Sequence, residues 1–394
     1  DIRNQVALFL IAGAILMWML SKSSNKTVWQ VLILIAVVLE IGIFASHTIN
    51  QREAFTAREM KQTGFGFKDK SVEALRYIKS QDKGFYRVEK DYASGAGMHS
   101  SLNDPETQKY YGTTSYSSFN NYHYVRFLET VGVIPKGQET RTRWVRGLRG
   151  RPLLMITGNI KYILSKQDQS PYENFGYDSI AGFGDVKVLK NQFFVPLGFT
   201  YDTYIKKSQY EKLSQLNRDV TLMHAFIIED EDEPRFADDF KAFNMKDTVK
   251  RYTFGQLRDD VAHLKEDTFS IQKFQPSHIT GNITLNKKEL LYISTPYDQG
   301  WEAYIDGKKT EPVLVHAGML GLIVPQGEHK IRFEYWPPFL RPMLFAQIGL
   351  ILLYFGLIAY TERRAPFVRK LIVAGIIIGV FIWRLKSYFG YFFG

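Results

Sequence analysis

The stretch EHKIRFEYW (328–336) alternates apolar and charged residues, and this alternation decides the fold of the surrounding chain. In an extended strand Ile331 and Phe333 share one face, while Lys330 and Arg332 share the other. A strand with one apolar face needs a second layer to cover that face. We therefore expect the chain before this stretch to supply further strands.

Strand patterns continue upstream of this stretch, separated by short turns. The Asp306-Gly307 pair suits a two-residue hairpin turn, because glycine adopts positive φ at no steric cost. The patterned segments are HITGNITL (278–285), ELLYIST (289–295), WEAYID (301–306), PVLVHA (312–317) and MLGLIVP (319–325). The sequence predicts a β-sandwich over residues 268–340.

Two large aromatic residues, Trp301 and Tyr304, lie within PYDQGWEAYIDGKK (296–309). They are three positions apart, so they face opposite sides of a regular strand. We expect one ring in the core. The other is available to stack on a sugar or to rest against a membrane.

Residues 48–267 show a mixture of helical and strand periodicity, which predicts an α+β domain. The expected helices are 71–81, 121–132 and 208–217, and the expected strands are 85–90, 160–166 and 185–191.

Apolar segments gather at the two ends of the chain, at 6–20, 28–46, 343–360 and 371–383. Their lengths approach the ~20 residues that cross a bilayer, which predicts transmembrane helical hairpins at 1–47 and 341–394. Buried core helices are the alternative. Lysine and arginine enrich both short hairpin loops, so the positive-inside rule predicts that these loops are cytoplasmic and that residues 48–340 are extracytoplasmic.

The chain has no cysteine, which excludes disulfides and thiolate chemistry, and its net charge of +10 favours an anionic partner. It lacks an initiator methionine, and apolar residues begin almost immediately. From this we expect the 394 residues to be the C-terminal part of a longer membrane protein.

The stretch RTRWVRGLRGR (141–151) is rich in arginine and contains no acid. Arginine binds phosphate through two parallel hydrogen bonds, so this stretch is a candidate phosphate-binding segment. A basic surface on anionic lipid head groups is an equal alternative. The predicted extracytoplasmic location disfavours nucleic acid. The candidate residues are Arg141, Arg143, Arg146, Arg149 and Trp144.

A second candidate segment, TTSYSSFNNYHY (113–124), combines hydroxyls, amides and aromatic rings. Sugars are bound by such groups, although polar runs of this kind are also common in ordinary loops. The candidate sugar-binding residues are Tyr116, Asn120, Asn121 and His123.

An acidic run, IIEDEDEPRF (227–236), is the one segment that suggests a divalent metal. It lacks the spacing of an EF-hand loop, and runs of this kind are usually solvated. We therefore expect no metal site and no cofactor, with a divalent metal left as an alternative.

Three blocks, in this order, resemble the YfhO family of bacterial membrane proteins. They are YYGTTSYSSFNN (110–121) followed by RFLETVG (126–132), then FFVPLGFTYDTYI (193–205), then LLYISTPYDQGWEAYIDGKKTEPVLVHAGMLGLIVPQGEHKIRFEYWPP (290–338). The resemblance implies a GT-C-type glycosyltransferase of the bacterial plasma membrane. Such an enzyme moves a sugar from undecaprenyl-phosphate to an extracellular polymer such as lipoteichoic acid.

The resemblance also implies that the catalytic acid precedes these residues, so no catalytic residue is assigned here and this piece alone should be inactive. The expected partners are membrane lipid, an undecaprenyl-phosphate-linked sugar and an anionic cell-surface polymer. A non-enzymatic, membrane-anchored scaffold that binds carbohydrate or wall polymer is the competing hypothesis.

Overall fold

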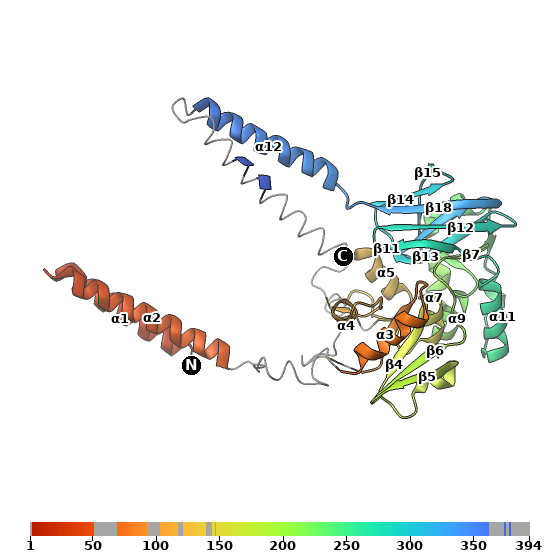
Figure 1. Ribbon diagram of the computed structural model, residues 1–394, viewed down its shortest axis with the longest axis horizontal. Coiled ribbons are helices and arrows are strands. Elements are labelled where there is room, and N and C mark those ends of the chain that lie inside the picture. Colours follow the sequence, from red (N-terminus) through yellow and green to blue (C-terminus); the bar gives the residue numbers. More distant parts are fainter. Residues whose placement is uncertain are drawn as a thin grey trace. The chain divides into compact units, whose positions relative to one another are not determined.

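The computed structural model describes residues 2–50, 69–92, 94, 103–116, 121–138, 144–145, 147–361, 374–375 and 378–379. The chain divides into one unit at residues 1–62 and a second at residues 63–394, each considered by itself below (Figure 1). The second unit mixes helices with several sheets, as the sequence predicts.

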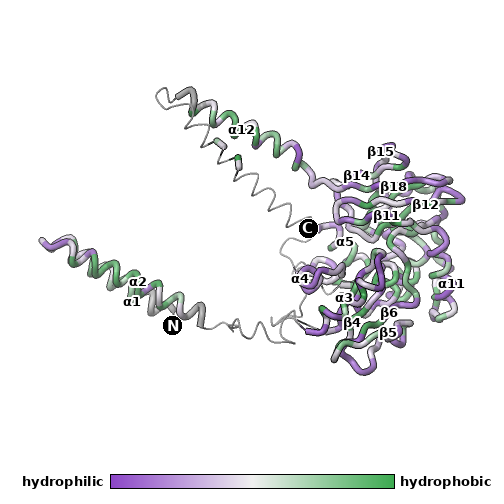
Figure 2. The backbone as a smooth tube through the Cα atoms, in the orientation of Figure 1, coloured by the Kyte–Doolittle hydropathy of each residue, from purple (hydrophilic) through white to green (hydrophobic). Residues whose placement is uncertain are grey.

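Two apolar helices form the first unit. Helix α1 (Ile2–Lys22) and helix α2 (Lys26–Asn50) are joined by a short polar turn and contact each other, with the rings of Phe9 and Phe44 6.4 Å apart. Of the described helices, one is long and apolar enough to cross a membrane, at Lys26–Ser46. Shorter apolar helices lie at Leu8–Lys22 and Leu340–Gly356 (Figure 2).

The helix α12 (Leu340–Thr361) follows the last strand after two prolines. Near its start the guanidinium of Arg341 lies 4.4 Å from the ring centroid of Trp336. The fourth predicted membrane segment, 371–383, falls mostly outside the described residues. The two transmembrane hairpins therefore stay a prediction.

A four-stranded sheet in the order β1-β4-β6-β5 begins the second unit, with strands β1 (Arg87–Lys90), β4 (Ile160–Ser165), β6 (Val186–Asn191) and β5 (Tyr177–Phe183). Helix α3 (Ser71–Gln81) covers one face, because Ala74, Leu75 and Ile78 recur at helical spacing and are all buried. Its bounds match the predicted helix.

A small parallel sheet, β10 (Lys241–Ala242), β8 (Thr203–Lys206) and β9 (Phe226–Ile228), lies next along the chain. Three short helices share an apolar core with it: α5 (Tyr122–Thr130), α7 (Pro152–Thr157) and α11 (Phe254–Leu264). A fourth, α9 (Gln215–Thr221), contacts α7.

The predicted helix at 208–217 is wrong in one respect. It consists of two helices, α8 (Lys207–Tyr210) and α9, because the Ser214 side chain accepts a hydrogen bond from the Asn217 amide and starts a new helix. The spacing of apolar residues in this segment is compatible with one helix, but the cap at Ser214 begins a second helix.

The predicted β-sandwich is present. One sheet has the order β11-β12-β18-β14-β15, and the other has the order β16-β17-β13-β7. The strands of the first are β11 (Ser270–Gln275), β12 (His278–Leu285), β18 (Gly327–Tyr335), β14 (Trp301–Ile305) and β15 (Lys308–Thr310). Those of the second are β16 (Val313–Val315), β17 (Met319–Val324), β13 (Glu289–Pro296) and β7 (Phe199–Tyr201).

Trp301 and Tyr304 do face opposite sides of β14. Trp301 is in the sandwich core, whereas the Tyr304 ring lies outside the core and is covered by Arg332, 4.0 Å from its centroid. Strand β7 precedes the predicted domain boundary at residue 268 and pairs with β13 beyond it. That pairing connects the α+β region to the sandwich through main-chain hydrogen bonds.

Gly300 and Gly307 are both required by the sandwich, for different reasons. A Cβ atom at Gly300 would lie 2.1 Å from the carbonyl oxygen of Trp336, whereas one at Gly307 meets nothing within 4 Å. Gly307 instead needs its positive φ of 82°, which follows Asp306 at 51° in the predicted hairpin turn.

Gly300→Ala should therefore destabilise the fold by about 3 kcal/mol, since backbone must move to admit the methyl group. The matched variant Gly307→Ala should cost only about 1 kcal/mol, the strain of one residue at positive φ. Denaturant unfolding of both purified variants measures the difference. Equal losses would contradict the close approach at Gly300.

A buried histidine joins the sandwich to the parallel sheet. His316 lies in the β16–β17 turn at φ 50°, and Ala317 follows at 59°. The His316 amide donates to the Ile227 carbonyl at 2.8 Å, and its Nδ1 accepts from the Ile227 amide at 3.4 Å. Burial lowers the pKa of His316 to about 3, so the ring stays neutral in the folded protein.

This lowered pKa makes stability depend on pH. Between the ordinary value of 6.5 and about 3, the unfolded chain binds the proton that folded His316 rejects, so stability is complete above that window and falls on acidification within it. The loss is at most about 1.4 kcal/mol per pH unit.

His316→Asn should flatten this slope, because asparagine tolerates positive φ and keeps an acceptor for the Ile227 amide without titrating. Thermal unfolding of both proteins between pH 7 and pH 4 tests it. An identical slope in the variant would show that other groups dominate the pH dependence.

Candidate functional site

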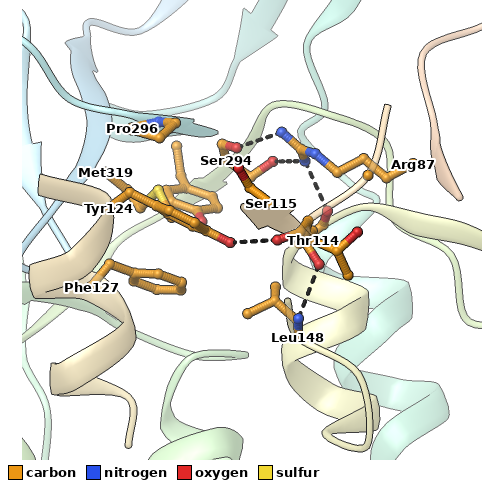
Figure 3. A pocket seen from close by; sticks show the side chains of 13 residues that line it. Arg87, Thr114, Ser115, Tyr124, Phe127, Leu148, Ser294, Pro296 and Met319 are labelled. Atoms are coloured by element: carbon orange, nitrogen blue, oxygen red, sulfur yellow. Dashed lines mark hydrogen bonds between the residues drawn. The ribbon is translucent and has the colours of Figure 1, made fainter. Parts of the chain in front are cut away.

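A cavity of about 200 Å³ opens where the α+β region meets the sandwich (Figure 3). Its volume is below the ~300 Å³ of a typical drug-sized site, so it accommodates a small group such as one sugar ring or one phosphate. The lining comes from β1, α5, β13, β17, the segment 112–115 and the residues on either side of α7. It comprises Arg87, Gly112, Thr113, Thr114, Ser115, Tyr124, Phe127, Leu148, Gly158, Tyr292, Ser294, Pro296 and Met319.

Arg87, at the start of β1, crosses to the sandwich. Its Nη1 donates to the Gly158 carbonyl at 2.8 Å and to Ser294 Oγ at 2.6 Å, and its Nη2 donates to the Ser294 carbonyl at 2.7 Å. Figure 3 shows the guanidinium and Ser294 on one side of the cavity, and Tyr124, Phe127 and Met319 on the other.

Ser294 is itself held in place. Its hydroxyl donates to Asn159 Oδ1, and the Asn159 amide donates to the carbonyls of Val195 and Pro196, both at 2.9 Å. Asn159 is fully buried at φ 56°, a conformation that asparagine tolerates better than most residues. The acceptor for Arg87 is therefore rigid.

The charge of Arg87 is not neutralised by an ion pair in the described part of the chain, since its hydrogen bonds go to neutral oxygens. Burial lowers the pKa of Arg87, and the nearby Tyr292, Tyr124 and Glu89 oppose this effect. Among the described residues, three of the five guanidinium N–H groups have a hydrogen-bond acceptor, whereas Nε and one Nη2 hydrogen have none. A partly buried cation with spare donors favours an oxyanion.

Behind the cavity, Glu89 anchors the hydroxyl wall. It is 2% exposed and accepts from the Thr113 amide at 2.7 Å and from Thr113 Oγ1 at 2.5 Å. The Leu148 amide donates to the same Thr113 hydroxyl at 3.0 Å, and Tyr124 donates to the Thr113 carbonyl at 3.2 Å. Burial raises the pKa of Glu89, although the bonds from Thr113 offset part of the rise.

The two segments singled out in the sequence lie side by side. Strand β2 (Ser115–Tyr116) pairs antiparallel with β3 (Trp144–Val145), and Tyr116 is directly opposite Trp144. The sugar-binding candidate segment also contributes Thr113, Thr114 and Ser115 to the cavity lining. The basic segment contributes Leu148.

The individual candidates are placed as follows. Asn121 starts α5, its side chain accepting from the Tyr124 amide at 3.0 Å. The His123 ring packs edge-on against Tyr297 at 5.2 Å, and burial lowers its pKa. Tyr116 is exposed, and its amide donates to Asn103 Oδ1 at 2.7 Å.

Arg149 lies against β1, where its Nη1 donates to the Lys90 carbonyl at 2.5 Å. The described part of the chain excludes Arg141, Arg143, Arg146 and Asn120, and it gives only the backbone of Trp144. Ligand binding by all nine candidates stays a prediction.

Arg87, Glu89 and Ser294 were not recognised as site residues from the sequence. A usable signal exists in FYRVEK (85–90), where arginine and glutamate occupy alternate positions of a short strand between aromatic residues. Charged side chains on such a strand face either solvent or a polar site.

In the acidic run 227–236, two of the acids pair with lysines: Glu229 with Lys207 at 2.7 Å and Glu233 with Lys206 at 3.0 Å.

Thr113→Val tests the rigidity of the hydroxyl wall. It should destabilise the protein by about 2 kcal/mol, because Glu89 and the Leu148 amide each lose a buried partner. Thr113→Ser keeps the hydroxyl and should cost less than about 1 kcal/mol. Chemical unfolding of the two variants compares them. A valine variant as stable as the serine variant would exclude a buried Thr113–Glu89 bond.

Comparison with known proteins gives one family. A family model described as "Bacterial membrane protein YfhO" matches residues 3–253 and 243–346. The "Uncharacterized protein YfhO" of Bacillus subtilis (strain 168) is 24% identical over 111 residues, which cover 28% of this chain and 12% of that protein. No solved structure matches.

Proposed function

The chain belongs to the YfhO family of bacterial membrane proteins, and we propose that it is part of a membrane glycosyltransferase whose Arg87 cavity binds a phosphate-bearing substrate. The donor is a sugar on undecaprenyl-phosphate, and the acceptor is an extracellular polymer such as lipoteichoic acid. In this proposal α1, α2, α12 and the segment at 371–383 span the plasma membrane, and residues 48–340 are extracytoplasmic.

The proposal rests on Arg87, whose hydrogen bonds among the described residues go to neutral oxygens and which lies beside a wall of hydroxyls. Undecaprenyl-phosphate-linked sugars and lipoteichoic acid both combine phosphate with hydroxyls. The two spare N–H groups of Arg87 match the geometry of a phosphate oxygen pair. Thr114 and Ser115 supply the neutral groups that hydrogen-bond a sugar or a polyol.

In the reaction, an acceptor hydroxyl oxygen forms a bond to the anomeric carbon while the bond from that carbon to the phosphate oxygen breaks. The lipid phosphate leaves with the electron pair, and the acceptor proton passes to a carboxylate that is not assigned among these residues. Within this scheme Arg87 holds the phosphate of the donor or the acceptor, so it is a binding residue.

Cells that lack the gene test the proposal when they are complemented with wild-type, Arg87→Lys or Arg87→Gln protein. We expect wild-type protein to restore the sugar content of purified lipoteichoic acid, Arg87→Gln to restore less than about a tenth of it, and Arg87→Lys an intermediate amount, because lysine keeps the charge without the fork.

The control is Arg235→Gln, which removes an exposed arginine 3.8 Å from Glu311 and should restore sugar fully. Protein level in the membrane is measured for each variant. Full sugar with Arg87→Gln at a normal level would reject the role of Arg87. Unchanged sugar in the deletion itself would favour the non-enzymatic scaffold.

A further inference from the structure

A second recess lies in the α+β region, between α9, α11 and the β8–β10 edge. We call it the α9–α11 hollow, and its lining includes Asp202, Asn217, His224, Asp247, Tyr252 and Asp260. Its volume of about 540 Å³ is within the usual range for a ligand site. None of these residues lines the Arg87 cavity.

A histidine in this hollow lies beside a carboxylate. His224 Nε2 lies 3.1 Å from Asp260 Oδ2, and the Tyr252 hydroxyl donates to the same oxygen at 2.5 Å. The imidazole of His224 therefore lies beside the carboxylate that binds Tyr252, and both groups belong to the lining of the hollow. In the described part of the chain, Asp260 Oδ1 and His224 Nδ1 have no hydrogen-bond donor.

Helix α11 positions Asp260, and the turn after α9 positions His224. Asp260 lies on α11, whose start is fixed by a reciprocal capping box between Thr253 and Gln256. His224 follows α9, and its amide donates to the Thr221 carbonyl at 2.9 Å. Of the three residues, Asp260 lies within a helix, His224 lies in the turn after α9, and Tyr252 precedes α11 and is tied to it by its bond to Asp260.

Charge distinguishes this hollow from the Arg87 cavity. Asp202 is paired with Lys287 at 2.7 Å and Lys241 at 3.1 Å. Asp260 has only the tyrosine and the histidine, and Asp247 has no ion pair among the described residues. The hollow is acidic on balance and repels a phosphate.

We propose that the α9–α11 hollow binds a sugar residue through the His224–Asp260–Tyr252 group. Carboxylate and imidazole acceptors match sugar hydroxyls, and the rings of Tyr252 and Phe243 in the wall offer apolar surface to a pyranose face. The acidic lining is compatible with a neutral sugar or a positively charged amino sugar, and it repels a negatively charged sugar phosphate.

Saturation-transfer NMR on the full chain tests this, in a detergent without sugar or phosphate such as lauryldimethylamine oxide. The probes are glucose, glucosamine, N-acetylglucosamine and inorganic phosphate. We expect transfer to at least one sugar at millimolar concentration. His224→Gln, Asp260→Asn and Tyr252→Phe should each weaken its Kd at least about five-fold.

The matched control is His278→Gln, which removes a histidine 3.7 Å from Glu334 on the sandwich and should leave the Kd unchanged. Near-UV circular dichroism verifies folding, and His224 is exposed enough for its variant to fold even where Asp260→Asn does not. Wild-type affinity in His224→Gln, or no sugar signal with the wild-type protein, overturns the proposal. The assay needs no donor lipid, so its result is independent of glycosyl transfer in cells.

Discussion

The hydrogen bonds from Arg87 to Ser294 are the interaction on which the site depends. They connect residues 207 positions apart and join the first strand of the α+β region to the sandwich. Burial of a guanidinium whose hydrogen bonds go to neutral oxygens costs free energy. In our proposal the remaining N–H groups of Arg87 bind a ligand in the cavity, which accounts for a charged group at this position. The geometry of the cavity follows from this one contact and from the Glu89–Thr113 bond beside it.

Two recesses with opposite electrostatics lie in the same unit. The Arg87 cavity is small and favours an oxyanion, while the α9–α11 hollow is larger and acidic. In our proposals they select the phosphate and the sugar portions of a polymer that contains both. Such a division would let one surface recognise a polymer by its repeat rather than by a single group.

The sandwich was predictable because strands β12 and β18 alternate buried and more exposed residues, as at Ile331 and Phe333, and because the Asp306-Gly307 pair marks a hairpin turn. Strand β7 was not, since it has only three residues and pairs with β13, about 90 positions later. The residues of the Arg87 cavity were harder to predict from the sequence than these strands. Arg87 and Glu89 sit on a strand whose charges suggested a solvent face, and nothing local to Ser294 signals its role. The candidate segment 113–124, chosen from composition and family resemblance together, contributes Thr113, Thr114 and Ser115 to the cavity lining, whereas its named candidates Tyr116, Asn121 and His123 do not line it.

The central claim is that the Arg87 cavity binds phosphate. Isothermal titration of the full chain with glycerol 1-phosphate, in a phosphate-free detergent, measures this most directly. Our account predicts binding by wild-type protein, with glycerol alone much weaker, and at least a ten-fold loss of affinity in Arg87→Gln. Equal affinity in wild-type and Arg87→Gln protein, or no preference for the phosphate over glycerol, would contradict it.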